Sequence, residues 1–512
     1  MTGLNTGWRI IPRFCNESVK RAQRYGLHSL LRKHRQLARY LALAAVPMTL
    51  PAQSARTAAP DIRVDIPAIE RYIARQMQRN RIPGVAVAIV SNDSVIYARG
   101  FGTDGFGTSV TDRTGFVLGS MSKSVTALAV MQLVERNLVQ LDAPVQQYLP
   151  WFRVADTTAS ARITVRQLLH HTSGIPTKAP RATGASRTLT DQVRALADVT
   201  LNNAPGAVHE YASPNYLVLG AIVEAVSLRS YASYVQTSIF VPLGMRDSHV
   251  DRTIALDHEN PGRLSSGHVY LFGFSVARTL SHEGDRLPTA ALISSAADMG
   301  RFLVAQLRTD SSELLSADGI AQMHTGGAPS DGFSYAFGWR DGTLAGERAV
   351  HHGGIVPNFR GKMVMLPDQR LGVVVLTNVS SAIPWPIAPT SHIMADEIAG
   401  ALIGVTLPVP SDKHRWLFGA IGAAMLLVII SQLRGLLRIF RGRNNGGRAP
   451  RAGMSMLTDL AFVAAVAFVI PRLAGLSWSE LLSVAPDVAW WLIIAATLSL
   501  VTVGARLVRR PR

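Results

Sequence analysis

Cysteine is nearly absent from this chain of 512 residues. The single cysteine, Cys15, lies in a basic arm ahead of the first apolar run, so a processed chain would contain none. This excludes a disulfide framework, a thiolate nucleophile and a cysteine-based metal site. The neighbouring His170 and His171 have no carboxylate or third histidine at ligand spacing, so we expect them to pack in the fold. We therefore expect no metal and no cofactor.

The middle of the chain carries no excess of either charge. The formal charge of +18 comes from residues 1–50 and 413–512, and residues 51–412 sum to zero. A nucleic-acid-binding domain would need its basic residues gathered on a folded face. Here the basic residues lie beside apolar runs, where they set the orientation of membrane segments. We expect a lipid bilayer as partner, and no nucleic acid.

Residues 1–55 have the order of an export signal. A long basic region is followed by the short apolar run 40–50 and then by Pro51-Ala-Gln-Ser-Ala55. The apolar run is about half of the ~20 residues that a spanning helix needs. A cleaved signal is therefore favoured over a retained anchor, although the sequence leaves both open.

The C-terminal region contains three apolar stretches, 416–433, 456–473 and 488–508, each long enough to span a bilayer. The connection after the first stretch and the tail after the third are rich in arginine, which predicts that both lie in the cytoplasm. Three spans then place the preceding residues outside the cytoplasmic membrane, the side to which an export signal directs them. The expected domains are 1–55 (basic arm and signal-like segment), 56–405 (catalytic domain), 406–415 (linker) and 416–512 (membrane anchor).

Hydrophobic periodicity in the central region predicts a mixed α and β domain. Residues 67–79 have helical spacing, and 120–137 should form a helix that is apolar nearly all round and therefore buried. Strands at 84–90 and 95–102 form one expected hairpin, and strands at 361–366 and 371–377 form another. An α+β fold with one antiparallel sheet follows.

Lysine is also scarce, and of the six lysines only Lys123 has a serine three residues before it. At helical spacing, the Ser120 and Lys123 side chains share one face. A buried lysine can take the proton from a serine nucleophile, and unpaired N–H groups at a helix start can stabilise an oxyanion. The motif Ser120-Met-Ser-Lys123 alone is weak, because an ordinary helix start can carry it.

Further segments support a catalytic interpretation. In chain order they are Ile82-Pro-Gly-Val-Ala-Val-Ala, Gly119-Ser-Met-Ser-Lys-Ser, Ile163-Thr-Val-Arg-Gln-Leu-Leu-His-His-Thr-Ser-Gly174, Tyr211-Ala-Ser-Pro-Asn-Tyr-Leu-Val-Leu-Gly220, Ser294-Ser-Ala-Ala-Asp298 and His352-Gly-Gly354. From about Ile82 to Asn378 the chain resembles the β-lactamase-related serine hydrolases, which include class C β-lactamases, D-Ala-D-Ala carboxypeptidases, D-aminopeptidases and esterases. The resemblance implies an antiparallel sheet flanked by helices, together with an all-helical domain.

The resemblance also implies roles for individual residues. Ser120 would be the acylated nucleophile, Lys123 its activator and Tyr211 the general base. His352 stands where penicillin-recognising members have the lysine of Lys-Thr-Gly, although His351 could take that place in a register shifted by one. The strand that His352 opens, which includes Gly354, would supply the second oxyanion donor, the N–H of Ile355.

Two substrate-contacting positions depart from the family pattern. Ser213 stands where most members have asparagine, and Asn358 stands where a glycine usually precedes the aromatic residue. The first departure puts ordinary β-lactamase activity in doubt. His268 and His282 are further candidate pocket residues, with solvated loop positions as the alternative.

Tyr-x-Ser, an outer catalytic domain and three C-terminal spans resemble one narrower group, the membrane-anchored peptidases that activate exported prodrugs by removing an N-acyl-D-asparagine cap. A lipid-acylated substrate would explain the anchor, because its acyl chain lies in the bilayer. The alternatives are a D-Ala-D-Ala carboxypeptidase, a β-lactamase or an esterase. A sensor that is acylated without turnover is the non-enzymatic alternative. The short Arg-rich connection between the first two spans argues against it, because it leaves no room for a cytoplasmic signalling domain.

Overall fold

The computed structural model describes residues 65–180, 182, 188–257, 259–279, 286–308, 310, 314–380, 390–409, 413–441, 449–474 and 477–508. Cys15, the signal-like segment and His282 lie outside these residues, so the structure does not bear on their expected roles.

An antiparallel sheet of eight strands forms the centre of the catalytic region, in the order β2-β1-β12-β11-β10-β9-β8-β7. The strands are β1 (Gly84–Ser91), β2 (Ser94–Gly102), β7 (Ala328–Ser330), β8 (Phe333–Tyr335), β9 (Arg340–Leu344), β10 (Glu347–Val356), β11 (Phe359–Leu366) and β12 (Leu371–Thr377). Both expected hairpins are confirmed, since β1 pairs with β2 and β11 with β12. The pairing of β1 with β12 joins strands nearly 300 positions apart, which no local sequence pattern predicts.

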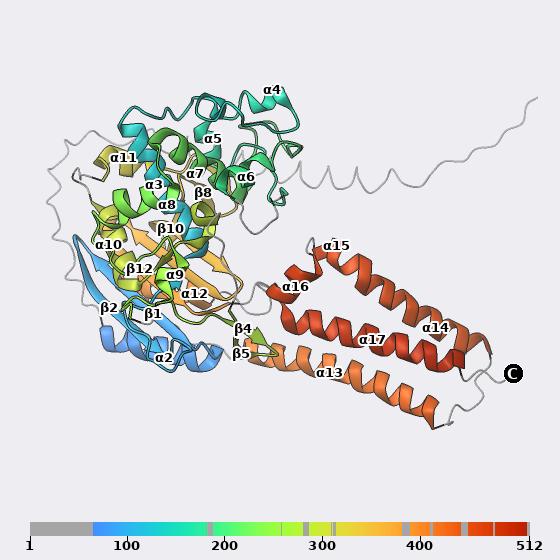
Figure 1. Ribbon diagram of the computed structural model, residues 1–512. Coiled ribbons are helices and arrows are strands. Elements are labelled where there is room, and N and C mark those ends of the chain that lie inside the picture. The colour runs from blue at the N-terminus through green and yellow to red at the C-terminus, as the bar shows by residue number, and fades with distance from the viewer. Residues whose placement is uncertain are drawn as a thin grey trace, which may run out of the picture. The chain divides into compact units, whose positions relative to one another are not determined.

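Helices cover both faces of this sheet (Figure 1). Helices α2 (Ile66–Asn80) and α12 (Thr390–Leu402) pack on one face, and α10 (Ala296–Leu307) packs on the other. Strands β1, β11 and β12 are consequently buried on both sides, which explains their nearly continuous apolar sequences. The predicted α+β fold is confirmed.

Helix α3 (Ser122–Glu135) lies at the centre of the larger core, and nearly all of its residues are buried as predicted. The expected helix from residue 120 begins differently, because Gly119–Met121 form a 3-10 turn, η1, ahead of α3. The other elements of this part are α4 (Thr157–Ser160), α5 (Val165–Leu169), α6 (Leu189–Arg194), α7 (Ser213–Ser227), α8 (Tyr231–Val235), η3 (Gln236–Phe240), α9 (Arg252–Ala255), η5 (Leu287–Ala291) and α11 (Ala317–His324). Helix α7 packs directly against α3 and brings a second part of the site to it.

Small sheets and short turns complete this region. Strands β4 (His268–Leu271) and β5 (Phe274–Ala277) form a hairpin, which pairs through β4 with β13 (Val379–Ser380). Strands β3 (Phe116–Val117) and β6 (Ile293–Ser294) pair with each other, and η2 (Val145–Gln147) and η6 (Pro367–Gln369) are single turns.

Three C-terminal helices are long and apolar enough to cross a membrane, at Gly419–Phe440, Met454–Leu473 and Pro486–Val508. They correspond to α13 (Lys413–Phe440), to α14 (Ala449–Ala464) continued by η7 (Ala465–Val469) and α15 (Ile470–Ala474), and to α17 (Pro486–Val508), with the short α16 (Trp478–Val484) before α17. The predicted three apolar helices are therefore confirmed by length and composition.

Polar side chains hold these helices together. The Gln432 amide of α13 donates to the Ala495 carbonyl and the Ser499 hydroxyl of α17, and Arg506 of α17 pairs with Asp459 of α14 at 2.8 Å. Polar groups in apolar helices are tolerated when they satisfy one another in this way.

Candidate active site

Two glycines allow the turn that carries Ser120 to approach strand β10. Gly119 has a φ of +57°, and a Cβ on it would lie 2.6 Å from the Ile355 nitrogen. A Cβ on Gly354 would lie 1.8 Å from the Leu118 carbonyl oxygen. Strand β9 pairs with β10 only as far as His351, so η1 lies against the remaining edge of β10. The backbone at Ile355 therefore lies beside the turn that carries Ser120, as an oxyanion donor would require.

Lys123 is fully buried, and its ammonium group contacts three oxygens. The Nζ atom lies 3.3 Å from Ser120 Oγ, 3.3 Å from Ser213 Oγ and 3.0 Å from the Thr289 carbonyl oxygen. Burial lowers the pKa of Lys123 below its usual value, and the neighbouring Tyr211 opposes this shift. A lysine with a lowered pKa is more often neutral, and can then accept a proton from Ser120.

Tyr211 lies next to this lysine, and contacts with His171 and Thr177 fix its position. Its ring centre is 5.0 Å from Lys123 Nζ and 4.4 Å from the ring centre of His171. The Thr177 hydroxyl donates to the Tyr211 carbonyl, and the Ala212 N–H donates to His171 Nδ1. Among the described residues, no side chain or backbone group forms a hydrogen bond of good geometry with the buried Tyr211 hydroxyl. That hydroxyl is therefore available for proton transfer to and from a substrate.

His352 is buried on the side of β10 that faces Tyr211. Its Nδ1 atom lies 2.7 Å from the Gly353 carbonyl oxygen and its Nε2 atom 3.1 Å from the Tyr335 hydroxyl. A carbonyl only accepts hydrogen bonds, so Nδ1 carries the proton and Nε2 accepts from Tyr335. Burial, with Arg340 and Lys123 nearby, lowers the pKa of His352 well below its usual value. The imidazole is therefore neutral at neutral pH and positions the Tyr335 hydroxyl.

His351 points to the opposite face of β10, as strand alternation requires. Burial, helped by Lys362, lowers the pKa of His351 to about 3. His352 therefore lies on the side of β10 that faces Tyr211, with the two ring centres 6.3 Å apart, and His351 lies on the other side.

Acid should destabilise the protein through His351. Its pKa in the folded chain lies below the ordinary value of about 6.5, so the unfolded chain binds the proton more tightly. The stability that the neutral ring confers is complete above pH ~6.5 and is lost as the pH falls toward 3. We expect His351→Gln to reduce the loss of Tm between pH 6.5 and 4, measured by thermal unfolding in detergent. An unchanged pH dependence would contradict this assignment.

The two positions that depart from the family pattern have different surroundings. Ser213 begins α7, ahead of Pro214 in the first turn, and its hydroxyl contacts Lys123. Asn358 lies in the turn between β10 and β11, buried, with its amide donating to the Arg278 carbonyl at 3.0 Å. Ser213 thus joins the cluster of Ser120 and Lys123, whereas the Asn358 side chain donates to the protein backbone.

His268 is the first residue of β4 and is buried, so the solvated position considered for it is wrong. Its Nδ1 atom lies 3.0 Å from the Asn378 carbonyl oxygen. Among the described residues, no group of three histidine, cysteine, aspartate or glutamate side chains could hold a metal ion.

Arg340, at the start of β9, adds a positive charge that the sequence motifs do not single out. Its guanidinium carbon lies 5.9 Å from the Tyr211 ring centre and 4.9 Å from that of Phe333. It contributes to lowering the pKa values of Lys123 and His352. No carboxylate in the described part of the chain pairs with Arg340, and its Nε atom is buried without a hydrogen bond. The site therefore contains a cation that is free to meet an anionic group.

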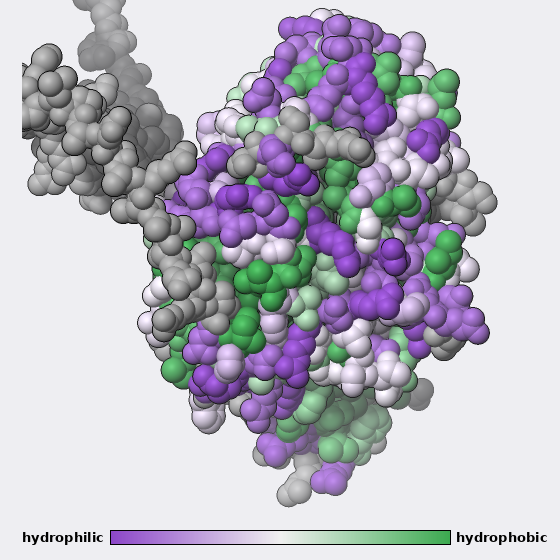
Figure 2. Space-filling view, turned by 90° about the vertical axis from the view of Figure 1, so that its left-hand side faces the viewer, coloured by the Kyte–Doolittle hydropathy of each residue, from purple (hydrophilic) through white to green (hydrophobic). Residues whose placement is uncertain are grey.

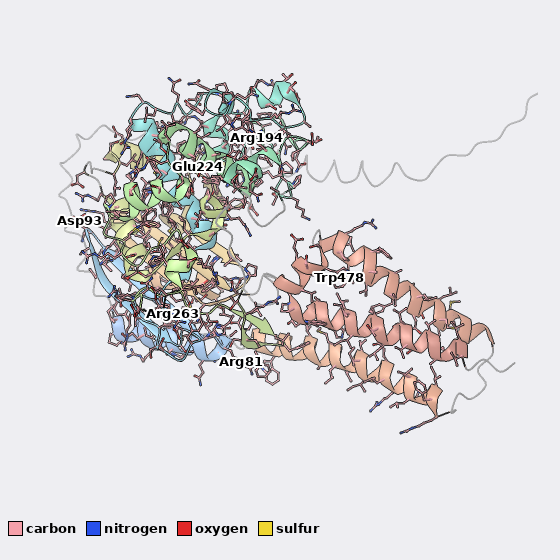
Figure 3. All side chains as sticks on the ribbon, viewed as in Figure 1. Arg81, Asp93, Arg194, Glu224, Arg263 and Trp478 are labelled. Atoms are coloured by element: carbon pink, nitrogen blue, oxygen red, sulfur yellow. The ribbon has the colours of Figure 1, made fainter. Side chains whose placement is uncertain are left out.

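A large groove lies elsewhere on the molecule. It has a volume of about 790 Å³, and Asp93, Asp112, Arg301 and Arg308 line it with several apolar side chains. Figure 3 labels Asp93 at the left of the molecule. Figure 2 views the molecule from that side and shows hydrophilic and hydrophobic residues interleaved on its surface. None of the catalytic candidates lines this groove.

Comparisons with known proteins show the family to which the chain belongs. Residues 69–384 match the family model described as "Beta-lactamase". The chain is 28% identical to "Protein flp" of Staphylococcus aureus (strain N315) over 61% of its own length and 63% of that protein, so it spans less than two thirds of that relative. It is 31% identical to "Penicillin-binding protein 4" of Amycolatopsis lactamdurans over 66% of this chain and 90% of that protein.

Solved structures show the same fold. The octameric penicillin-binding protein homologue from Pyrococcus abyssi is 26% identical, with a TM-score of 0.56 over 66% of this chain and 78% of that chain. The hydrolase EstCE1, described as having promiscuous acyltransferase activity, is 22% identical, with a TM-score of 0.55 over 65% of this chain and 97% of that chain. The family model covers more than half of the chain, which therefore belongs to the β-lactamase family of serine hydrolases.

Proposed function

We propose that this protein is a membrane-anchored hydrolase that cleaves amide or ester bonds outside the cytoplasmic membrane through an acyl-enzyme at Ser120. The observation that carries the proposal is the buried Lys123, whose Nζ lies 3.3 Å from Ser120 Oγ and beside Tyr211. A buried lysine without a carboxylate partner in the described chain has no structural ion pair to make, whereas a nucleophilic serine needs a proton acceptor at this distance.

The reaction follows from these contacts. Ser120 Oγ attacks the carbonyl carbon and loses its proton to the Lys123–Tyr211 pair. The developing oxyanion is stabilised by backbone N–H groups at Ser120 and Ile355. The same pair then protonates the leaving amine or alcohol, which departs to leave an ester on Ser120. Water attacks this ester, its proton is taken up by the pair, and the released serine regains a proton.

For the substrate, we propose an exported prodrug from which the enzyme removes an N-acyl-D-amino acid cap. The acyl chain of such a substrate partitions into the bilayer, so a site anchored at the membrane surface meets it at high local concentration. The three apolar helices support this anchoring. The most direct test compares N-acyl-D-asparagine amides, D-Ala-D-Ala peptides, a chromogenic cephalosporin and short esters with the purified full-length protein. Turnover of the capped amides at least as fast as the other substrates is expected, and turnover of none of them by folded protein would refute the proposal.

Membrane topology gives a separate prediction. Reporter fusions should place residue 400 outside the cytoplasm and residues 445 and 512 inside, because the arginines after the first and third spans favour the cytoplasmic side. A cytoplasmic reporter signal at residue 400 would contradict the scheme.

Arg340 favours a second candidate function, a D-Ala-D-Ala carboxypeptidase. The substrate of such an enzyme ends in a free carboxylate, which an unpaired guanidinium beside Tyr211 could bind. Replacing Arg340 with leucine should then weaken kcat/KM for D-Ala-D-Ala peptides while sparing neutral amides and esters. Equal losses on charged and neutral substrates would instead assign Arg340 to the tuning of Lys123.

Repeated turnover also separates an enzyme from an acylated sensor. A sensor would release one equivalent of leaving group and remain acylated, whereas the proposed enzyme continues to release product after the first equivalent.

A further inference from the structure

The β4–β5 hairpin exposes apolar side chains at its tip. Phe272, Phe274 and Val276 are 51%, 60% and 42% exposed. By contrast, Val269 and Tyr270 in β4 are buried. Phe272 and Gly273 form the turn with φ values of +49° and +80°. A bulky aromatic residue rarely adopts this backbone region, and here it is held there in an exposed position. We call Phe272, Phe274 and Val276 the hairpin tip.

A basic residue flanks the tip. The Arg81 guanidinium carbon lies 4.1 Å above the centre of the Phe274 ring, and its Nη1 donates to the Gly273 carbonyl at 2.9 Å. Figure 3 labels Arg81 beside the place where Figure 1 shows the β4–β5 hairpin. Phenylalanine together with basic residues is typical of surfaces that lie in the membrane–water interface, where apolar side chains enter the acyl boundary and cations meet lipid phosphates.

Hydrogen bonds join the hairpin to the segment that starts the third candidate span. The Phe272 N–H donates to Asp487 Oδ2 at 3.3 Å, and Arg278 Nη1 donates to the Leu482 carbonyl at 2.7 Å. Asp487 is the second residue of α17, and the exposed Trp490 follows within one helical turn, about 5 Å along the axis. The hairpin tip thus lies at the level where α17 would enter the bilayer.

We propose that the hairpin tip inserts into the lipid headgroup and acyl boundary at the outer end of α17. This inference rests on the proposed membrane anchoring. The bilayer is the partner that we propose for the hairpin tip, because the tip is hydrogen-bonded to the start of a candidate membrane span and has a cation beside it.

Contact with the bilayer would also orient the active site. At the base of the hairpin, the His268 N–H donates to the Asn358 carbonyl, and the Asn358 amide donates to the Arg278 carbonyl. Asn358 follows β10, whose backbone lies against the turn of Ser120. The tip therefore fixes the substrate-binding strand relative to the lipid surface, from which a lipid-tailed substrate would arrive.

Site-directed spin labelling of the full-length protein in lipid nanodiscs tests this inference. Because the chain has one cysteine, Cys15→Ser gives a background in which Phe272→Cys and Phe274→Cys can be labelled separately. Leu500→Cys, 49% exposed on α17, is the lipid-facing reference, and Leu228→Cys, 90% exposed at the end of α7, is the aqueous reference. Fluorophosphonate labelling of each variant verifies that the catalytic domain is folded.

Relaxation by oxygen should exceed relaxation by a water-soluble nickel chelate at 272, 274 and 500, with the ratio several-fold higher than at 228. Ratios at 272 and 274 equal to that at 228, while 500 stays lipid-exposed, would overturn the hairpin proposal and leave the anchoring intact. An aqueous ratio at 500 would overturn both. Low access of both reagents to the tip would show a protein contact there and would also refute insertion.

Discussion

Replacing Ser120 with alanine should lower turnover of the best substrate by roughly 10⁶-fold, the loss typical when a serine hydrolase loses its nucleophile. The Oγ atom is the group that lies 3.3 Å from Lys123, and an alanine offers no atom that can be acylated. A fluorophosphonate probe should label the wild-type protein and should fail to label Ser120→Ala. The ring and backbone contacts of the site do not involve Oγ, so the variant should fold.

Ser122→Ala is the matched control for this experiment. Ser122 is the first residue of α3, two positions beyond Ser120, and it is fully buried; its hydroxyl has no hydrogen-bond partner in the described part of the chain. It should retain much of the labelling and turnover. Probe labelling that survives the loss of Ser120 would show that another serine is the nucleophile.

Removing the Tyr211 hydroxyl should lower kcat strongly, although less than the loss of Ser120. Tyr211→Phe keeps the ring that packs 4.4 Å from His171, so folding and Tm should be preserved. Under the proposed mechanism, the variant loses the group that passes a proton between Ser120 and the leaving amine. We expect kcat to fall by about 10²- to 10⁴-fold, the usual contribution of general acid–base catalysis.

The substrate dependence of Tyr211→Phe provides the check. Amides have poor leaving groups that must be protonated, so they should lose more than esters with good leaving groups. If the purified variant turned over its best amide within a few-fold of wild type, Lys123 would be the sole base and the role of Tyr211 would be wrong.

The sequence predicted those parts of the fold that depend on local patterns. The hairpins at residues 84–102 and 361–377 follow from short turns between apolar runs, and the buried α3 follows from apolar residues on all its faces. The pair Ser120 and Lys123 follows from helical spacing within one turn. Tyr211 is 88 residues beyond Lys123, and only resemblance to a family placed it at the site.

Other parts of the site depend on tertiary packing and have no local signal. The Thr289 carbonyl reaches Lys123 from η5, and Tyr335 and Arg340 reach the site from β8 and β9. His171 was expected to pack, and it does, but its contact with Tyr211 requires the approach of α7 to the end of α5. Such contacts are set by how the helical part closes over the sheet, which periodicity does not encode.

The proposed function depends on catalysis through an ester on Ser120. Rapid acid quenching of the full-length protein with an N-acyl-D-asparagine amide, followed by peptide mass spectrometry, measures this intermediate directly. We predict that the peptide containing Ser120 gains the mass of the acyl group early in the reaction and loses it as substrate is exhausted. Steady release of product with an unmodified Ser120 peptide, or with the acyl group on another residue, would show that Ser120 is not the acylated residue.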